Sequence, residues 1–250
     1  MRNIALTVSY DGTNFSGWQI QQGLRTVQGE IENALEKIHK QKTSVAGSGR
    51  TDAGVHALGQ VASFFSPVDS IPAENYLPAL NSILPKDVRI LDSRQVAEDF
   101  HPRFSATSRT YRYFFHCGVP FAHETGYCWQ LHFHPDLNRL NKMSEFLHGE
   151  KDFATFTAAG DKSESTFRFV ESASFFPLGN KIVFEITANA FLWKMIRSIV
   201  GTMMDIEKKK LPPQEFLRIL ESANRKNAGQ TAPPHGLFLY RISYDGIKRH

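Results

Sequence analysis

The sequence predicts an α+β fold made of two ferredoxin-like β-α-β-β-α-β halves, which join mainly antiparallel sheets and leave a cleft between them. Two observations carry this prediction. Segments that alternate apolar and polar residues are followed by segments with apolar residues every three or four positions, and this order occurs twice. The chain has 250 residues, of which 41% are hydrophobic, so it is long enough to bury the core that two packed halves require.

The first half, residues 1–104, is expected to contain two helices and four strands. Apolar residues spaced three or four apart predict an amphipathic helix over residues 26–39, with Thr26 as its N-cap. The other expected elements are a helix at 72–83, with Ala73, Leu77, Leu80 and Ile83 on one side, and strands at 3–10, near Val45, at 58–65 and at 88–96.

The second half, residues 105–250, begins near Phe104-Ser105-Ala106 and repeats the architecture without repeating the residues. No long linker or low-complexity segment separates the halves, so we expect them to pack as one unit. The expected elements are a strand at 107–116, a helix at 135–147, a hairpin of strands 167–176 and 181–188, helices at 191–207 and 213–222, and a closing strand at 236–244.

Composition limits the classes of partner and compartment. The formal net charge is +4 and the pI is about 9.0, which agrees with a polyanionic partner without requiring one. Two cysteines without a CxxC motif argue against a zinc site or a disulfide framework and fit a reducing, cytoplasmic setting. No signal segment or apolar run of membrane-spanning length occurs, so no membrane partner is expected.

Basic residues also gather locally, and several lie beside aromatic ones. This mixture suits contacts to an RNA backbone together with stacking on bases, although each single cluster is also explained as a solvated face. The clusters are Arg103-Phe104, Arg109 to Tyr113, Lys208 to Lys210, Arg225-Lys226 and Lys248 to His250.

A glycine-rich loop at residues 47–57, G-S-G-R-T-D-A-G-V-H-A, is the strongest candidate for chemistry. Glycines let a backbone approach a ligand, and the neighbouring Arg50 would keep the Asp52 carboxylate ionised for attack or proton transfer. The loop lacks the lysine of a phosphate-binding Walker loop and the third glycine of a dinucleotide fingerprint. A tight turn with a self-bonded aspartate is the alternative.

Two further segments supply candidates for the same site. Arg197 falls on the expected buried face of the 191–207 helix, marked by Trp193, Ile196, Val200 and Met203-Met204. There it would need a carboxylate partner such as Asp52, or it lies at the edge and reaches solvent. Tyr111 and Tyr113 share one face of a strand, either as a core pair or with a hydroxyl directed at a substrate.

Histidines give no sign of a metal site. His132 and His134 form an H-x-H pair on a possible strand, but no third ligand lies nearby, and His235 stands in a proline-rich turn that looks structural. We therefore expect no bound metal.

Taken together, these segments resemble the tRNA pseudouridine synthase A (TruA) family over nearly the whole chain. The resemblance rests on residues 10–19 (Y-D-G-T-N-F-S-G-W-Q), 26–29 (T-V-Q-G), 49–57 (G-R-T-D-A-G-V-H-A), 103–106 (R-F-S-A), 111–113 (Y-R-Y), 191–197 (F-L-W-K-M-I-R) and 231–237 (T-A-P-P-H-G-L). Departures from the family pattern are Pro102, Asp161 and the pair Trp193-Lys194, which bear on RNA contacts rather than on the reaction.

The resemblance implies a pseudouridine synthase fold with a catalytic cleft, and isomerisation of uridine to pseudouridine at positions 38, 39 and 40 of the tRNA anticodon arm. It implies that Asp52 is the catalytic carboxylate and that Arg197 pairs with it. Arg50 would help extrude the target nucleotide, and Tyr111 would stack on the base and help remove the C5 proton. Thr51 and His56 would contribute to substrate binding. The family works as a homodimer on tRNA without a cofactor or metal.

Alternatives remain open at this point. Asp52 would act either at C1′, directly or through a glycal, or at C6 of the ring. A non-catalytic RNA-binding module is the main rival function, because sheets with exposed aromatic residues also suit RNA binding. A hydrolase that uses Asp52 as nucleophile would need a metal site or phosphate loop, and neither is visible in the sequence.

Overall fold

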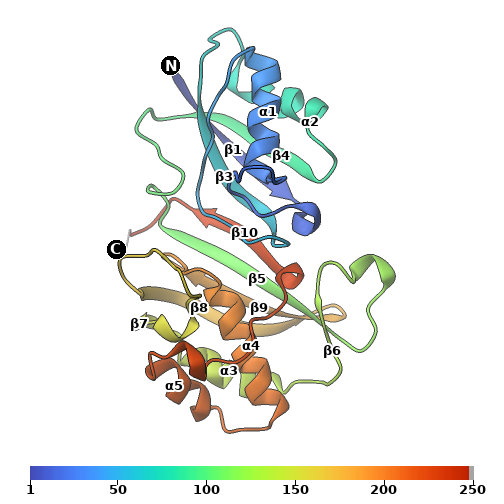
Figure 1. The fold of residues 1–250 in the computed structure, drawn as a ribbon, viewed down its shortest axis with the longest axis vertical. Coiled ribbons are helices and arrows are strands. Elements are labelled where there is room, and N and C mark those ends of the chain that lie inside the picture. Colours follow the sequence, from blue (N-terminus) through green and yellow to red (C-terminus); the bar gives the residue numbers. More distant parts are fainter. Residues whose placement is uncertain (248–250) are drawn as a thin grey trace. The chain divides into compact units, whose positions relative to one another are not determined.

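The computed structural model describes residues 1–247, which fall into two compact units (Figure 1). Unit 1 comprises Met1–Thr107 and Phe238–Ile247, and unit 2 runs from Ser108 to Leu237. The basic cluster Lys248-Arg249-His250 lies outside the described residues. Both units mix helices with a mainly antiparallel sheet, so the predicted α+β class is confirmed.

The sheet of unit 1 is centred on β1 (Arg2–Tyr10), which pairs antiparallel with β3 (His56–Ser66) on one side and β4 (Val88–Val96) on the other. The short β2 (Ala46–Gly47) pairs antiparallel with β3. The resulting order β4-β1-β3-β2 is that of a ferredoxin-like β-α-β-β-α-β unit, as the sequence predicts.

Helix α1 (Val27–His39) begins where the sequence predicts it. Thr26 has an extended backbone, and its hydroxyl accepts a hydrogen bond from the Gly29 N–H at 3.3 Å, which confirms it as the N-cap. The apolar side chains Ile31 and Leu35 are fully buried. Figure 1 shows α1 and α2 side by side over the β1–β3–β4 part of the sheet.

Helix α2 (Tyr76–Ile83) is shorter than expected because the 3₁₀ turn Ala73–Asn75 precedes it. Its main core residue is Tyr76, whose hydroxyl bonds to Ser66 Oγ at 2.6 Å. Ile83, expected on the buried side, is 37% exposed at the end of the helix.

In unit 2 the strand order is β5 (Ser108–Cys117), β9 (Lys181–Ala188), β8 (Phe167–Leu178) and β7 (Gly149–Asp152), all antiparallel neighbours. Strand β6 (Trp129–Leu131) pairs parallel with β5. The hairpin of β8 and β9 is confirmed. Strands β6 and β7 were not predicted, because three or four residues are too few to show alternation.

Three helices belong to unit 2: α3 (Leu137–Glu145), α4 (Met195–Lys208) and α5 (Gln214–Glu221). The expected start of α4 at residue 191 is wrong. Lys194 has a left-handed backbone with φ 61°, so regular helix begins only at Met195. Trp193 therefore precedes the helix and is 45% exposed instead of buried.

Strand β10 (Leu237–Ser243) was expected to close the second half, but all of it after Leu237 is grouped with unit 1. It pairs parallel with β3 at Phe238↔His56 and Leu239↔Ala57. At the end of the strand, the Ser243 carbonyl accepts the Thr107 N–H at 2.9 Å, and the hydroxyl of the next residue, Tyr244, donates to Pro102 O at 3.0 Å. These contacts join the two ends of unit 1.

Short 3₁₀ helices complete the two units: Gly12–Asn14 and Ala73–Asn75 in unit 1, and Ala122–Glu124, Ala154–Phe156, Arg225–Asn227 and Pro234–Gly236 in unit 2. Across residues 1–247, no helix combines the length and the apolar character needed to cross a membrane.

Candidate active site

The glycine-rich loop connects β2 to β3 and turns sharply at Asp52. Val55 N–H donates to the Asp52 carbonyl at 3.2 Å, and Gly54 inside this turn has φ 76°, a left-handed conformation that favours glycine. At the start of the loop, Ser48 N–H donates to the Val61 carbonyl at 2.8 Å. The loop is thus fixed to β3 and turned back on itself.

A second segment, residues 12–18, supports the loop from outside. Trp18 N–H donates to the Thr51 carbonyl at 3.2 Å, and Gly54 N–H donates to the Phe15 carbonyl at 3.4 Å. A Cβ atom on Gly12 would collide with the backbone of Val55, and one on Gly17 would lie 2.5 Å from the Thr51 carbonyl. Close approach to the loop thus explains both glycines.

Side chains along the loop alternate between solvent and interior. Arg50 is exposed, and its Nε donates to Gln19 Oε1 at 3.2 Å. Thr51 is 8% exposed and bonds to the Tyr10 hydroxyl at 2.7 Å. Asp52 is half-buried. The loop therefore exposes the Arg50 guanidinium, leaves Asp52 half-buried and is anchored by the threonine between them.

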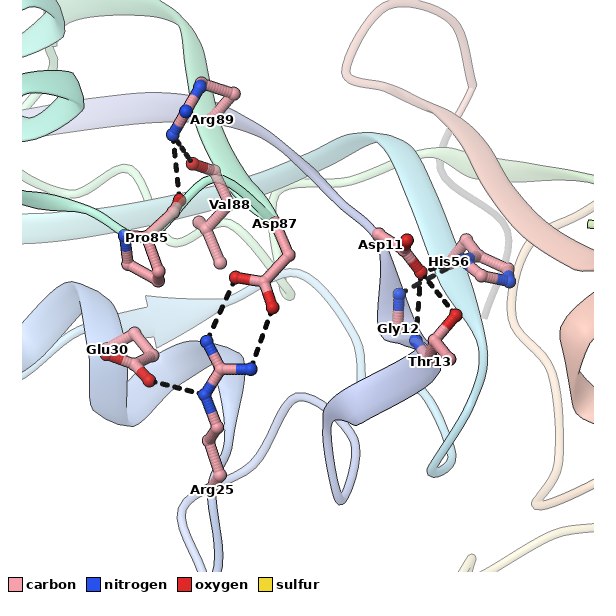
Figure 2. A network of polar contacts seen from close by, with 10 residues as sticks. All are labelled: Asp11, Gly12, Thr13, Arg25, Glu30, His56, Pro85, Asp87, Val88 and Arg89. Carbon is pink, nitrogen blue, oxygen red and sulfur yellow. Dashed lines mark hydrogen bonds and ion pairs between the residues drawn. The ribbon is translucent and has the colours of Figure 1, made fainter. Parts of the chain in front are cut away.

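His56, the first residue of β3, is 1% exposed (Figure 2). Its Nδ1 accepts the Gly12 N–H at 3.0 Å and lies 3.2 Å from Asp11 Oδ1, while its ring stacks on Phe238 at 4.5 Å. Like Thr51, His56 is buried. These two residues can therefore affect substrate binding only indirectly, by holding the loop in place.

Figure 2 also shows Arg25, for which the sequence predicted no role. Its guanidinium forms a two-point contact with Asp87, at 2.8 and 3.0 Å, and Nε donates to Glu30 at 2.8 Å. The same group lies 4.2 Å over the Phe15 ring. The hydrogen bond to Asp87 is the main cause that raises the pKa of Arg25 above its ordinary value. The Arg25 guanidinium therefore stays positively charged. In the sequence, the one feature that could have pointed to Arg25 is its position directly before the T-V-Q-G segment.

Tyr111 lies in unit 2, in the middle of β5 opposite Ile186. It is 8% exposed, and its ring meets Phe191 edge-on at 5.2 Å and 81°. Tyr113 is fully buried and donates its hydroxyl to the Pro233 carbonyl at 2.7 Å, while burial raises its pKa. Tyr113 is thus a core residue, and only Tyr111 keeps some solvent contact.

Arg197 lies in the first turn of α4 and is half-buried. Its Nε donates to the Ala232 carbonyl at 2.8 Å, and Ala232 N–H donates back to the Arg197 carbonyl at 3.0 Å. One turn later, a Cβ on Gly201 would collide with the Gln230 carbonyl. The T-A-P-P-H-G-L segment therefore packs directly on α4 and fixes the arginine.

Within residues 1–247, the remaining histidines do not form a metal site. His132 and His134 follow β6 instead of lying on it, and both are exposed. Burial lowers the pKa of His235, which keeps it neutral in its turn. Within residues 1–247 no group of three or more His, Cys, Asp or Glu side chains is arranged to hold a metal ion.

Comparison with known proteins now gives the family. A family model described as tRNA pseudouridine synthase matches residues 6–105 and 143–245. This chain belongs to that family. The predicted resemblance is thus confirmed, and the loop and the Arg197 helix lie within the matched residues.

Curated relatives cover almost the full length. A tRNA pseudouridine synthase A from Treponema denticola is 53% identical over 249 residues, which cover 97% of this chain and 93% of that protein. The protein of the same name from Treponema pallidum (strain Nichols) is 50% identical over 94% of this chain and 85% of its own. That from Borrelia hermsii is 43% identical over 98% and 100%.

Among solved structures, a chain of the crystal structure of a Cbf5–Nop10–Gar1 complex matches with a TM-score of 0.36 and 12% identity, covering 80% of this chain and 53% of that one. A likeness at this level does not bear on the fold or the site.

Proposed function

We propose that this protein isomerises uridine to pseudouridine at positions 38, 39 and 40 in the anticodon arm of tRNA. One observation carries the proposal: the G-R-T-D-A-G-V-H-A loop of a tRNA pseudouridine synthase family member presents Arg50 and Asp52 on a rigidly supported turn. The relatives named above are synthases, so a purely RNA-binding role is not favoured.

The reaction balances within the substrate alone. The N1–C1′ bond breaks, the uracil rotates, a C5–C1′ bond forms, the proton on C5 leaves and N1 gains one. No atoms are added and no oxidation state changes overall, so we propose that no cofactor or metal takes part. A carboxylate and a proton-transferring group are sufficient for such a rearrangement.

Arg50 and Asp52 take the first steps in this proposal. A stacked base must leave the helix before its glycosidic bond is accessible, at a cost of a few kcal/mol. The exposed Arg50 guanidinium would offset part of this cost by filling the gap. Asp52 would then act at C1′, directly or through a glycal, or at C6. The ordered turn around Asp52 supports either route.

Tyr111 and Arg197 complete the proposed site. Tyr111 would stack on the extruded base and assist loss of the C5 proton; its fixed edge-on contact with Phe191 supports a positioned ring. Arg197 would pair with the Asp52 carboxylate, and its anchoring to Ala232 supports a fixed guanidinium. Residues 1–104 would thus supply the aspartate loop, and residues 105–250 the tyrosine and arginine.

The proposed setting is a homodimer that binds tRNA in the cytoplasm. The +4 net charge and the exposed lysines at 208–210 support a polyanionic partner. Sedimentation with and without tRNA would measure the oligomeric state directly.

The deciding experiment measures tritium release from tRNA that carries 5-³H-uridine, without added metal or nucleotide. Wild type should release tritium, and Asp52→Asn should release none while binding tRNA with similar affinity. Asp69→Asn is the matched control, because this carboxylate also lies in unit 1 and its side chain is 88% exposed. It should release tritium at the wild-type rate.

Two results would count against the proposal. Turnover by Asp52→Asn would remove the aspartate from its role. Tight binding by wild type without release from any tRNA would instead support the RNA-binding module.

A further inference from the structure

We propose that Trp193 is a stacking platform for an unpaired base of the tRNA substrate. The platform consists of the Trp193 indole, the Lys194 ammonium and the turn of residues 158–161 that holds them. This inference rests on the proposed function, because it assumes an RNA substrate. It adds a binding contact to unit 2 beyond the residues that the loop and Tyr111 provide.

The backbone of Trp193 is held from both sides by one turn. Its N–H donates to Asp161 Oδ2 at 2.5 Å, and its carbonyl accepts the Ala158 N–H at 3.0 Å. Burial raises the pKa of the Asp161 carboxyl, but hydrogen bonds from Ser163 and from Trp193 N–H outweigh it, so the pKa lies below its usual value. The acceptor is therefore a carboxylate at neutral pH.

The indole is exposed although its backbone is fixed. Its exposed fraction is 45%, whereas Trp18 is 1% exposed. Gly160, with φ 87°, lies against the edge of the ring, and a Cβ there would be 3.8 Å from Cζ3. An ordered aromatic surface of this kind loses little conformational entropy when a flat ligand stacks on it.

A positive charge accompanies the aromatic face. The Lys194 ammonium lies 4.9 Å from the centre of the Trp193 ring. A base stacked on the indole carries a phosphate nearby, which this ammonium can neutralise. Aromatic ring and cation together are the combination that binds single-stranded nucleic acid.

The position along the chain connects the platform to the proposed chemistry. Trp193 and Lys194 directly precede α4, whose first turn carries Arg197. Trp193 also contacts both Asp161 and Lys194.

Tryptophan fluorescence during tRNA titration tests the platform directly. Trp18 is buried and Trp129 half-buried, so stacking on Trp193 should quench a fraction of the wild-type emission. In Trp193→Phe, which keeps an aromatic ring, that fraction should vanish while affinity changes little. Trp193→Ala should bind tRNA about 5- to 150-fold more weakly, with kcat at saturating tRNA near the wild-type value.

Matched controls separate stacking from other effects. Phe121→Ala removes another aromatic residue of unit 2, 66% exposed, and should leave tRNA affinity unchanged. An anticodon stem-loop should quench Trp193, whereas a blunt RNA duplex, which has no unpaired base, should not. Thermal melting verifies that Trp193→Ala is folded.

The proposal is overturned if folded Trp193→Ala binds tRNA as tightly as wild type, or if the quenching persists in Trp193→Phe. Equal quenching by the blunt duplex would also overturn it, because it would show that Trp193 contacts the RNA backbone and not an unpaired base. If wild type binds tRNA but releases no tritium, the proposed function fails while the fluorescence result still decides the platform.

Discussion

At the scale of single residues, Arg25 joins segments that are distant in sequence. Its contacts reach Glu30 in α1, Asp87 before β4 and the Phe15 ring, and the Phe15 carbonyl in turn accepts the Gly54 N–H of the aspartate loop. Arg25 is therefore a positioning residue that supports the loop of Asp52 through Phe15.

Arg25→Met should lower the free energy of unfolding by about 1 kcal/mol and reduce kcat more than tRNA affinity, because the loop loses support rather than a substrate contact. Urea unfolding and single-turnover tritium release measure the two effects. Arg218→Met is the control, since it breaks an exposed pair with Glu215 three residues away and should change neither. A wild-type turnover rate in Arg25→Met would contradict this role.

His39 gives unit 1 a pH-dependent stability. Its ring bonds to Thr43 Oγ1 at 2.7 Å and to the Tyr76 hydroxyl at 2.9 Å, and burial lowers its pKa below the ordinary value of 6.5. The unfolded chain therefore takes up a proton at a pH where folded His39 does not. Its contribution is fully present above pH 6.5 and falls as the pH drops below 6.5 towards the folded pKa.

His39→Gln should therefore be less stable than wild type at about pH 7.5 but should lose less stability between about pH 7.5 and 5.5. Urea midpoints at the two pH values measure this difference. Equal losses in both proteins would show that another group titrates.

At the scale of elements, the sequence predicts the start of a helix correctly where contacts between neighbouring residues determine that start. The start of α1 was predictable because the capping hydroxyl of Thr26 and its partner Gly29 are three residues apart. The start of α4 was not, because Asp161 captures the Trp193 N–H from 32 residues away and the backbone reverses at Lys194. The spacing of apolar residues contains no information about the hydrogen bond from Trp193 to Asp161 or about the left-handed backbone of Lys194.

The candidate site shows the same division. The loop with Arg50 and Asp52 was visible as a motif, and the resemblance assigned roles to Tyr111 and Arg197. The burial of Thr51 and His56 was not visible, because it depends on Tyr10, Gly12 and Phe238, which come from other strands and turns.

Gly12→Ala tests the packing between residues 12–18 and the loop. The added methyl group collides with the Val55 backbone, so the free energy of unfolding should fall by about 1–3 kcal/mol, and turnover should fall with it. Gly126→Ala is the matched control, because nothing lies within 4 Å of the place that its added methyl group would take. Thermal melting and tritium release would be measured together. Unchanged melting of Gly12→Ala would show that the loop can move aside.

At the scale of the whole molecule, the surface charge should govern RNA binding. Lys208, Lys209 and Lys210 are exposed at the end of α4. The logarithm of the tRNA association constant should decrease linearly with the logarithm of salt concentration. Replacing all three lysines by Gln should reduce that slope by about 2 to 3, as expected if each neutralises one phosphate. Filter binding at several salt concentrations measures the slope, and a flat wild-type response would exclude this contribution.

The grouping of β10 with unit 1 also belongs to this scale. The sequence predicts the strand itself, but its parallel partner His56–Ala57 lies far away along the chain. Pairing between strands so far apart in the chain depends on the assembled sheet, so no pattern of neighbouring residues in the sequence predicts it.

This pairing has a consequence for synthesis on the ribosome. Residues 108–237 of unit 2 form one continuous stretch, so all of them have emerged before residues 238–247 do. Until then the part of β3 that pairs with β10 has no partner on that side, and unpaired edges of this kind invite association with other chains. A nascent chain will therefore complete this stretch of unit 2 first. Synthesis of unit 1 starts earlier, but unit 1 is completed later, because its last residues are 238–247.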